Sequence, residues 1–155
     1  MEREFELLKI GRNRLLNLLD KLTEEELVEI PEGFNNNVLW NAGHIITSQQ
    51  RLCYGLAGLE LNVPKDYTDL YAKGSSPKNW TKTPDVAELK KLLPDTTAIQ
   101  QDYKNGLFKN FKPYETSYGF MLNTIEDAIA FNNIHEALHT TVASCITRLV
   151  KKPTF

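Results

Sequence analysis

The sequence contains little cysteine, no long apolar run and no cluster of basic residues. Its two cysteines, Cys53 and Cys145, are too far apart for any common metal-binding or redox spacing. No stretch approaches the roughly 20 consecutive apolar residues that a transmembrane helix needs. The segment REFELLKI near the start carries charges among its apolar residues and does not read as a signal peptide. Two free thiols without a secretory signal predict a cytoplasmic protein that does not cross a membrane.

The net charge and the length indicate which class of partner and how many domains to expect. The net charge is −2, whereas a nucleic-acid-binding surface normally requires a basic patch, so we expect no nucleic-acid partner. A chain of 155 residues is long enough to bury one hydrophobic core of its own. We therefore expect a single domain over residues 1–155.

Four segments have the apolar spacing of amphipathic helices, and no alternating segment indicates a strand longer than a few residues. The first covers about residues 2–22 and the second about residues 36–58. The third begins near Thr83 and is interrupted by Pro94, because proline cannot continue a helix. The fourth follows Thr124, a residue type that caps helices. This pattern predicts an all-α protein, an antiparallel four-helix bundle.

A long segment between the second and third helices, about residues 60–83, is rich in proline, glycine, serine, lysine and tyrosine. Compact domains rarely contain a loop of this length unless it has a function. We interpret it as a long loop that can form a flap over a binding site.

The stretch IHEALH places His135 and His139 four residues apart, so that both lie on one face of the last helix. The same stripe contains Ala128, Asn132, Val142, Ile146 and Leu149. The two imidazoles are predicted to point inward at its centre. Burying two imidazoles is costly unless both nitrogens of each ring find partners. A divalent ion that takes one nitrogen from each neutral ring removes this cost. Two hydrogen-bonded core histidines without a metal are the alternative.

The same stretch fits the H-E-x-x-H pattern of zinc proteases, which take a third ligand from further along the chain. Residues 140–155, TTVASCITRLVKKPTF, contain no aspartate, glutamate or histidine. The protease interpretation therefore lacks its third ligand.

The remaining histidine, His44, lies on the second predicted helix. Its face carries small, polar and aromatic residues, including Trp40, Asn41, Ser48 and Arg51. Such a mixture is typical of a pocket wall and equally of a solvated face. The position of Trp40, one turn before His44, favours the pocket, because a solvated face would leave the indole in water.

Together, LWNAGHII and the distant FNNIHEALH resemble the DinB/YfiT-like superfamily of metal-dependent four-helix-bundle proteins. The order of elements is similar over nearly the whole chain, including YETSYGF before the last helix. The resemblance implies that His44, His135 and His139 bind a divalent ion such as zinc, nickel or iron. Relatives often have glycine and glutamine where this chain has Thr141 and Val142. The three ligands are kept, but contacts that relatives make at those two positions are not carried over.

The resemblance also implies an activity, because the family includes thiol-dependent S-transferases and a thiol-dependent isomerase. We expect a metal-dependent transferase that uses a low-molecular-weight thiol, or a metal-assisted hydrolase, acting on a small molecule. Two alternatives remain open. One is a non-catalytic metal-stabilised bundle that binds a ligand or a protein partner, and the other is a metal-free helical interaction module. Relatives commonly pair, so a homodimer is expected.

Two charged residues have competing interpretations. Glu136 lies about 100° from the ligand direction on the last helix. It is a candidate catalytic residue that orients an imidazole or accepts a proton, or else a solvated carboxylate at the boundary of the core. Arg51 lies two turns beyond His44 and either binds an acidic group of the substrate or forms an ion pair between helices.

Five further residues are candidates for the pocket. Asn41 and Asn132 each stand three residues before a ligand histidine, and with Trp40 they are expected beside the site. Tyr114 and Tyr118, in the loop before the last helix, either reach the rim of the pocket or pack in the ordinary way.

Overall fold

A computed structural model describes residues 1–151, and helices dominate it. The α-helices in chain order are α1 (Glu2–Leu19), α2 (Glu24–Val28), α3 (Val38–Gln50), α4 (Tyr67–Tyr71), α5 (Val86–Leu92), α6 (Thr97–Lys104) and α7 (Ile125–Val150). The π-helical segment Arg51–Gly55 continues α3 directly, and a short 3₁₀ turn covers Pro77–Asn79.

Two very short strands, β1 (Tyr114–Glu115) and β2 (Met121–Leu122), pair antiparallel in the connection before α7. Tyr114 faces Leu122 and Glu115 faces Met121 in this hairpin. The hairpin is too small to change the fold class.

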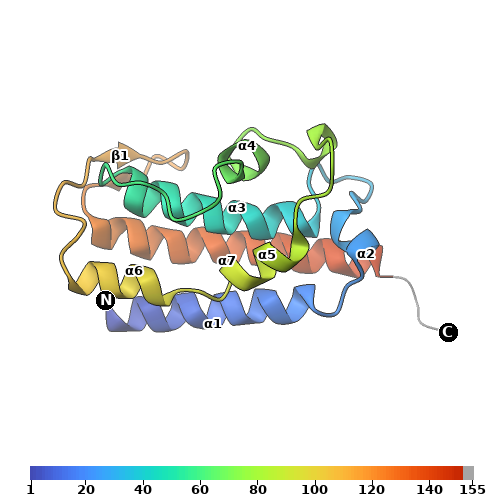
Figure 1. Ribbon diagram of the computed structural model, residues 1–155, viewed down its shortest axis with the longest axis horizontal. Coiled ribbons are helices and arrows are strands. Elements are labelled where there is room, and N and C mark those ends of the chain that lie inside the picture. Colours follow the sequence, from blue (N-terminus) through green and yellow to red (C-terminus); the bar gives the residue numbers. More distant parts are fainter. Residues whose placement is uncertain (152–155) are drawn as a thin grey trace.

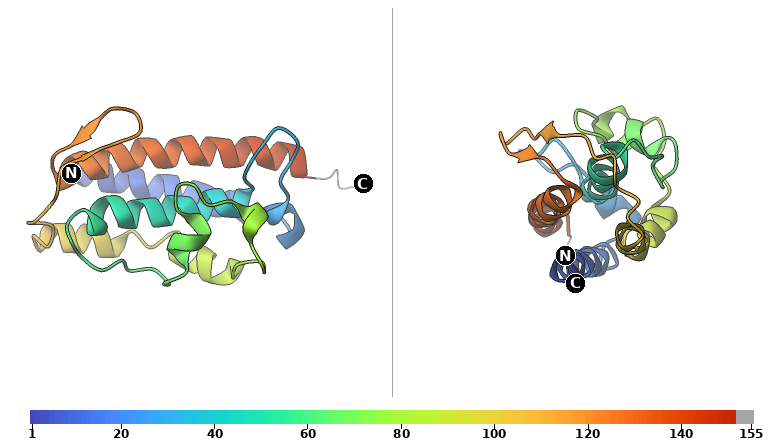
Figure 2. Two further views of the ribbon diagram at one scale, coloured as in Figure 1. Left: turned by 90° about the horizontal axis from the view of Figure 1, so that it is seen from above. Right: turned by 90° about the vertical axis from the view of Figure 1, so that its left-hand side faces the viewer.

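The long helices lie along one common direction and enclose a shared core (Figure 1). In the end-on view of Figure 2, α1, α3, α6 and α7 surround the centre of the molecule. Helix α7 packs against both α3 and α1. The predicted all-α bundle is confirmed. Within the described part of the chain, no helix combines the length and apolarity needed to span a bilayer.

The third side of the bundle is divided between α5 and α6, with Pro94 in the break between them, as predicted. The predicted start near Thr83 was too early. The carboxylate of Asp85 accepts a hydrogen bond from the backbone N–H of Glu88 at 2.9 Å, and this cap fixes the start of α5 at Val86.

The start of α7 agrees with the prediction. The hydroxyl of Thr124 accepts the backbone N–H of Asp127 at 3.2 Å, and the Asp127 carboxylate accepts that of Thr124 at 3.1 Å. This reciprocal pair satisfies two N–H groups that would otherwise lack partners at the helix start.

The inward face of α7 differs from the predicted one. Its fully buried residues follow a row that contains Asn132, Glu136, Ala143 and Ile146, with Glu136 near the middle. Val142 and Leu149, expected on the inward stripe, are 39% and 59% exposed. The two histidines of α7 are therefore half-buried at the edge of the buried row, so the prediction that they lie at its centre was wrong.

Part of the segment at residues 60–83 is packed into the core. Tyr67 and Tyr71 of α4 are buried and belong to the core with residues of α3. The ring of Tyr71 lies against Gly43, where a Cβ atom would collide with it. Glycine at position 43 thus lets α4 approach the backbone of α3.

Candidate metal centre

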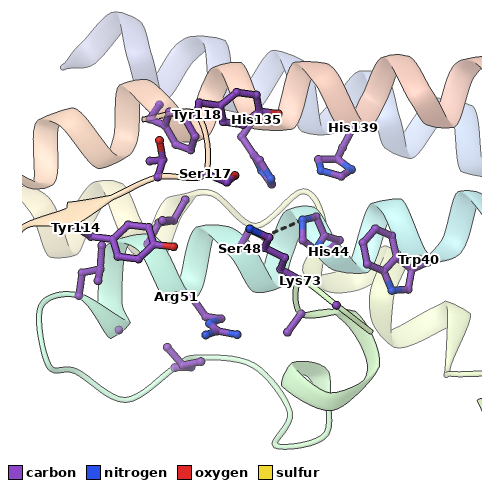
Figure 3. A pocket seen from close by; sticks show the side chains of 18 of the residues that line it. Trp40, His44, Ser48, Arg51, Lys73, Tyr114, Ser117, Tyr118, His135 and His139 are labelled. Carbon is purple, nitrogen blue, oxygen red and sulfur yellow. Dashed lines mark hydrogen bonds between the residues drawn. The ribbon is translucent and has the colours of Figure 1, made fainter. Parts of the chain in front are cut away.

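The three histidines come together between α3 and α7, although 91 residues separate the first of them from the second in the sequence. One ring nitrogen of each of His44, His135 and His139 lies within 4.8 Å of the others. Their ring centroids are 4.5 to 5.1 Å apart. Figure 3 shows His44 on α3 facing the two histidines of α7. His44 is only 5% exposed, so a solvated face on α3 is excluded.

The tautomer of His44 follows from its partners. Its Nδ1 is 2.6 Å from the carbonyl oxygen of Tyr71, which can only accept, so Nδ1 carries the proton and donates. Nε2 then bears the lone pair. The hydroxyl of Ser48, 3.2 Å away, donates to this nitrogen. Nε2 of His44 is therefore available as a ligand atom once Ser48 turns away.

His139 is oriented in a similar way by Asn41. The amide nitrogen of Asn41 donates to the carbonyl oxygen of Asn37 at 2.8 Å, which turns its Oδ1 toward the Nδ1 of His139, also at 2.8 Å. Nδ1 of His139 therefore donates, and Nε2 keeps its lone pair. Asn41 does not line the pocket but holds a ligand candidate in place, the usual task of the residues behind a metal site.

His135 has an open hydrogen-bonding position. Its Nδ1 is buried and has no hydrogen-bond partner among residues 1–151. Such an orphaned atom costs roughly 1–3 kcal/mol unless something binds it. Three imidazoles with available lone pairs, one of them otherwise unpaired, are a donor set that suits a divalent transition metal. The residues present therefore fit the ion that the sequence predicts.

All three imidazoles are held in the neutral form that metal binding requires. Burial, together with the positive charge that His44 would carry, lowers the pKa of His135 to about 4. Burial and both neighbouring imidazoles lower that of His139 to about 3. Burial lowers the pKa of His44 as well, against a hydrogen bond to Tyr71 that raises it, and the nearby Arg51 guanidinium lowers it further.

Trp40 encloses the site from the side of α3. Its indole stacks on the His44 ring with a centroid distance of 4.6 Å and an angle of 11°. The indole Nε1 donates to the hydroxyl of Ser75 at 2.9 Å, and that hydroxyl donates to the carbonyl of Leu70. Trp40 thus lines the pocket and also ties the segment after α4 to α3.

An open pocket of about 860 Å³ adjoins the three imidazoles. One wall is formed by α3 and its π-helical continuation, another by the segment after α4, and a third by the hairpin and α7. Trp40 and Arg51 line it, as do Tyr114 and Tyr118, so both tyrosines reach the pocket. Figure 3 shows these side chains around a common space. Arg51 forms no ion pair with any residue in 1–151, so the inter-helix pair proposed for it is absent there.

Glu136 points away from the histidines. The guanidinium of Arg12 donates to both of its carboxylate oxygens at 2.6 and 2.7 Å, and also to the carbonyl of Leu93 at 3.0 Å. The amide of Asn132 donates to Glu136 at 2.7 Å. Glu136 and Asn132 are buried and do not line the pocket. The expectation of a solvated carboxylate was wrong, and the geometry gives no support to a catalytic Glu136 or to a pocket role for Asn132.

The chain matches the DinB superfamily over residues 7–143, which is most of its length. The protein belongs to the DinB superfamily. No curated protein matches the sequence closely enough to count as a relative. This membership confirms the resemblance found in the sequence, and the histidine cluster that could hold a metal ion lies within the matched region of this DinB protein.

Sequence reasoning missed several residues that shape the site of this DinB protein. Gly43, directly before His44, permits the approach of Tyr71, whose carbonyl fixes the His44 ring. A glycine in the middle of a helix often marks such a close approach, so this signal was present in the sequence. Lys73 and Ser75 carried no such signal, because only the folded path of the 60–83 segment brings Lys73 to the pocket and the Ser75 hydroxyl to the indole of Trp40.

Proposed function

We propose that this DinB protein is a divalent-metal-dependent enzyme that acts on a small molecule in the pocket beside His44, His135 and His139. The observation that carries this proposal is the open pocket of about 860 Å³ adjoining three neutral imidazoles. A purely structural metal site is normally closed by protein ligands, whereas a catalytic site keeps room for water or substrate. Zinc, nickel and iron are the candidate ions, because imidazole suits all three.

Such an ion, when bound by three neutral imidazoles, lowers the pKa of a water or thiol that joins it and so provides a nucleophile near neutral pH. The chain supplies the surroundings. Tyr71 and Asn41 hold two of the imidazoles in the required tautomer. The Ser48 hydroxyl lies beside Nε2 of His44 and is placed to hydrogen-bond a small molecule that enters there.

Thiol S-transfer is the reaction we propose first, with hydrolysis as the competing outcome. The pocket has enough room for both a thiol and an electrophile, since drug-sized ligands occupy cavities of this order of size. In an S-transfer, the new carbon–sulfur bond forms as the leaving group departs with the former bonding pair. The Trp40 indole and the leucines of the pocket wall would give the reacting sulfur apolar surroundings on their side of the pocket.

The first test is the metal content of protein purified without a histidine tag. About one equivalent of a transition metal per chain is expected, and complete absence after supplementation with zinc, nickel and iron in turn would contradict the proposal. Loaded protein is then screened with an electrophile and, separately, bacillithiol, mycothiol and glutathione. Turnover that requires a thiol supports S-transfer, whereas turnover without any thiol supports hydrolysis.

The substitution His44→Ala separates catalysis from a stabilising role of the ion. A catalytic site should lose turnover while the bundle stays folded. A non-catalytic metal-stabilised bundle should instead lose much of its unfolding free energy, because metal binding and folding are then coupled. Lys78→Ala, in an exposed turn of the same side of the molecule, serves as the control.

We also propose a cytoplasmic homodimer. The free thiols of Cys53 and Cys145 suit a reducing compartment. Ile134, Leu138 and Val142 stand about one turn apart on the outer side of α7 and are 62%, 47% and 39% exposed. An apolar row of this kind supports pairing of two chains. Sedimentation of the wild type and of Ile134→Lys tests it, and a monomeric wild type at micromolar concentration would contradict it.

A further inference from the structure

We propose that the substrate site takes an amphipathic small molecule whose anionic group, a carboxylate or a phosphate ester, is bound jointly by Arg51 and Lys73. The proposal depends on the proposed function only in treating this pocket as the substrate site. The chemical class of the ligand follows from the pocket's charges, from the way Lys73 is held and from the apolar wall beside both cations.

Within residues 1–151, the lining of this pocket contains no aspartate or glutamate, although acidic residues outnumber basic ones in the chain, 20 to 18. Among the described residues that line it, Arg51 and Lys73 alone carry a fixed charge. A second hollow, of about 740 Å³ beside α4 and α5, has the opposite character, since Asp66, Asp85 and Glu88 are among its lining residues. Clefts of one sign of charge concentrate ligands of the other sign, so the first pocket favours anions.

Both cations are free to bind a ligand. The ion pairs within residues 1–151 involve Arg12, Lys90 and the N-terminal amine, and neither Arg51 nor Lys73 has an ion-pair or hydrogen-bond partner there. A guanidinium and an ammonium facing one pocket can together satisfy a carboxylate or phosphate group, because each supplies several N–H donors.

Lys73 is held at the pocket by its neighbours on both sides. Two residues before it, the carbonyl of Tyr71 accepts the Nδ1–H of His44. Two residues after it, the hydroxyl of Ser75 accepts the indole N–H of Trp40. The backbone that carries Lys73 is therefore fixed to α3 at both ends. Figure 3 shows the Lys73 side chain extending over the pocket in front of α3. Arg51 lies further along, in the π-helical continuation of α3.

An apolar wall adjoins the two cations. It is formed by Leu52, Leu56, Leu59 and Leu61 together with Phe131, whose ring stacks on His135 at a centroid distance of 6.2 Å. A small inorganic anion has no apolar portion that could pack against this wall. A ligand with one anionic group and an apolar portion would occupy both features at once.

Three probes of equal chain length test the inference: hexanoate, hexyl phosphate and hexan-1-ol. Their dissociation constants are measured by two-dimensional NMR titration of the metal-free full-length protein, so that no anion can bind through a metal ion. We expect at least one anion to bind about tenfold tighter than the alcohol, as one or two charge-assisted hydrogen bonds would give. The better of the two anions identifies the ligand group.

The variants Arg51→Gln and Lys73→Gln are each expected to weaken anion binding by about threefold or more, in line with partly exposed charge pairs. The double variant should bind hexanoate and hexan-1-ol equally. Lys78→Gln is the matched control, because Lys78 lies in the same segment but outside this pocket, and its anion affinity should stay at the wild-type value.

Equal affinity for anions and alcohol in the wild type, failure of all three probes to bind, or an anion preference that survives the double variant would each overturn the inference. The proposed function is tested separately by the metal content. Protein that prefers anions but binds no metal would support the two-cation site and contradict the proposed enzyme. Protein that binds metal but shows no preference for anions would support the proposed metal site and contradict the two-cation site.

Discussion

Residues 135 and 136 are neighbours on α7, yet their side chains differ in one essential respect. Glu136 forms a buried ion pair with Arg12, which we call the closed cluster, whereas His135 belongs to the three imidazoles at the pocket, the open cluster. Glu136 has both carboxylate oxygens bonded by Arg12, and its ion pair is enclosed by the core. His135 joins two other imidazoles at an open pocket, and its Nδ1 has no partner in the described chain. A buried polar group whose hydrogen bonds are all made stabilises the fold. A side chain that lines a cavity and has a polar atom without a partner indicates a binding site.

The clearest way to break the closed cluster is Arg12→Ala. It leaves Glu136 buried without its ion partner, and we expect the unfolding free energy to fall by about 3–5 kcal/mol. Urea denaturation measures the change. The exposed Arg14→Ala on the same helix is the control and should stay within about 0.5 kcal/mol of the wild type. A loss below about 1 kcal/mol for Arg12→Ala would mean that the ion pair does not stabilise the bundle.

The corresponding change in the open cluster is His135→Gln. We expect metal affinity to fall by more than about 100-fold, since even residues behind the ligands typically contribute 10- to 100-fold. The stability of the metal-free protein should change by less than about 1 kcal/mol, because this nitrogen has no hydrogen bond to lose. Competition with a chelator and urea denaturation give the two values. Large destabilisation without metal would show that His135 belongs to the structural cluster instead.

A smaller effect is expected from Asn41→Ala, which removes the acceptor of the His139 Nδ1–H bond. Metal affinity should fall by about 10- to 100-fold as the ring loses its fixed orientation. Asn41→Asp keeps an acceptor oxygen and should retain most of the affinity. If both variants bind metal equally well, Asn41 does not orient the ligand.

A separate prediction concerns the pH dependence of the metal-free protein. Unfolded histidine titrates near 6.5, whereas the pKa is lowered to about 4 at His135 and about 3 at His139. Between pH 6.5 and 4 the unfolded chain therefore binds protons that the folded chain does not, so stability falls as the pH falls. Above pH 6.5 these two histidines no longer make the unfolding free energy depend on pH.

Urea midpoints between pH 7.5 and 4.5 measure this slope. The double variant His135→Gln, His139→Gln should lose most of it above pH 5, where few carboxyl groups titrate. A wild-type curve that is flat from pH 6.5 to 5 would show that the two imidazoles protonate readily in the folded state.

Much of the fold could be predicted because its signals are local. Pro94 breaks the third side of the bundle, and Thr124 begins α7, in both cases through backbone chemistry that acts within a few residues. The inward stripe of α7 was misplaced because periodicity counts apolar residues. In this protein the middle of the buried row is Glu136, which the sequence marks as polar and only Arg12, 124 residues away, makes acceptable in the core.

The site was predictable in part for the same reason. The spacing of His135 and His139 fixes their common face, and the resemblance to the family implied that His44 joins them. Lys73 could not be found in this way, because its place depends on hydrogen bonds from Trp40 and His44 to a segment about 30 residues further on.

The sequence by itself therefore determined the helices, their breaks and the pairing of His135 with His139, since each follows from dihedral preferences, caps or spacing along one helix. His44 joined that pair only through the resemblance to the family. Only the tertiary structure decided which buried polar residues have hydrogen-bond partners and which have a polar atom left without one. That distinction depends on partners brought together from distant parts of the chain, Arg12 to Glu136 and Tyr71 to His44, while Nδ1 of His135 is left without one.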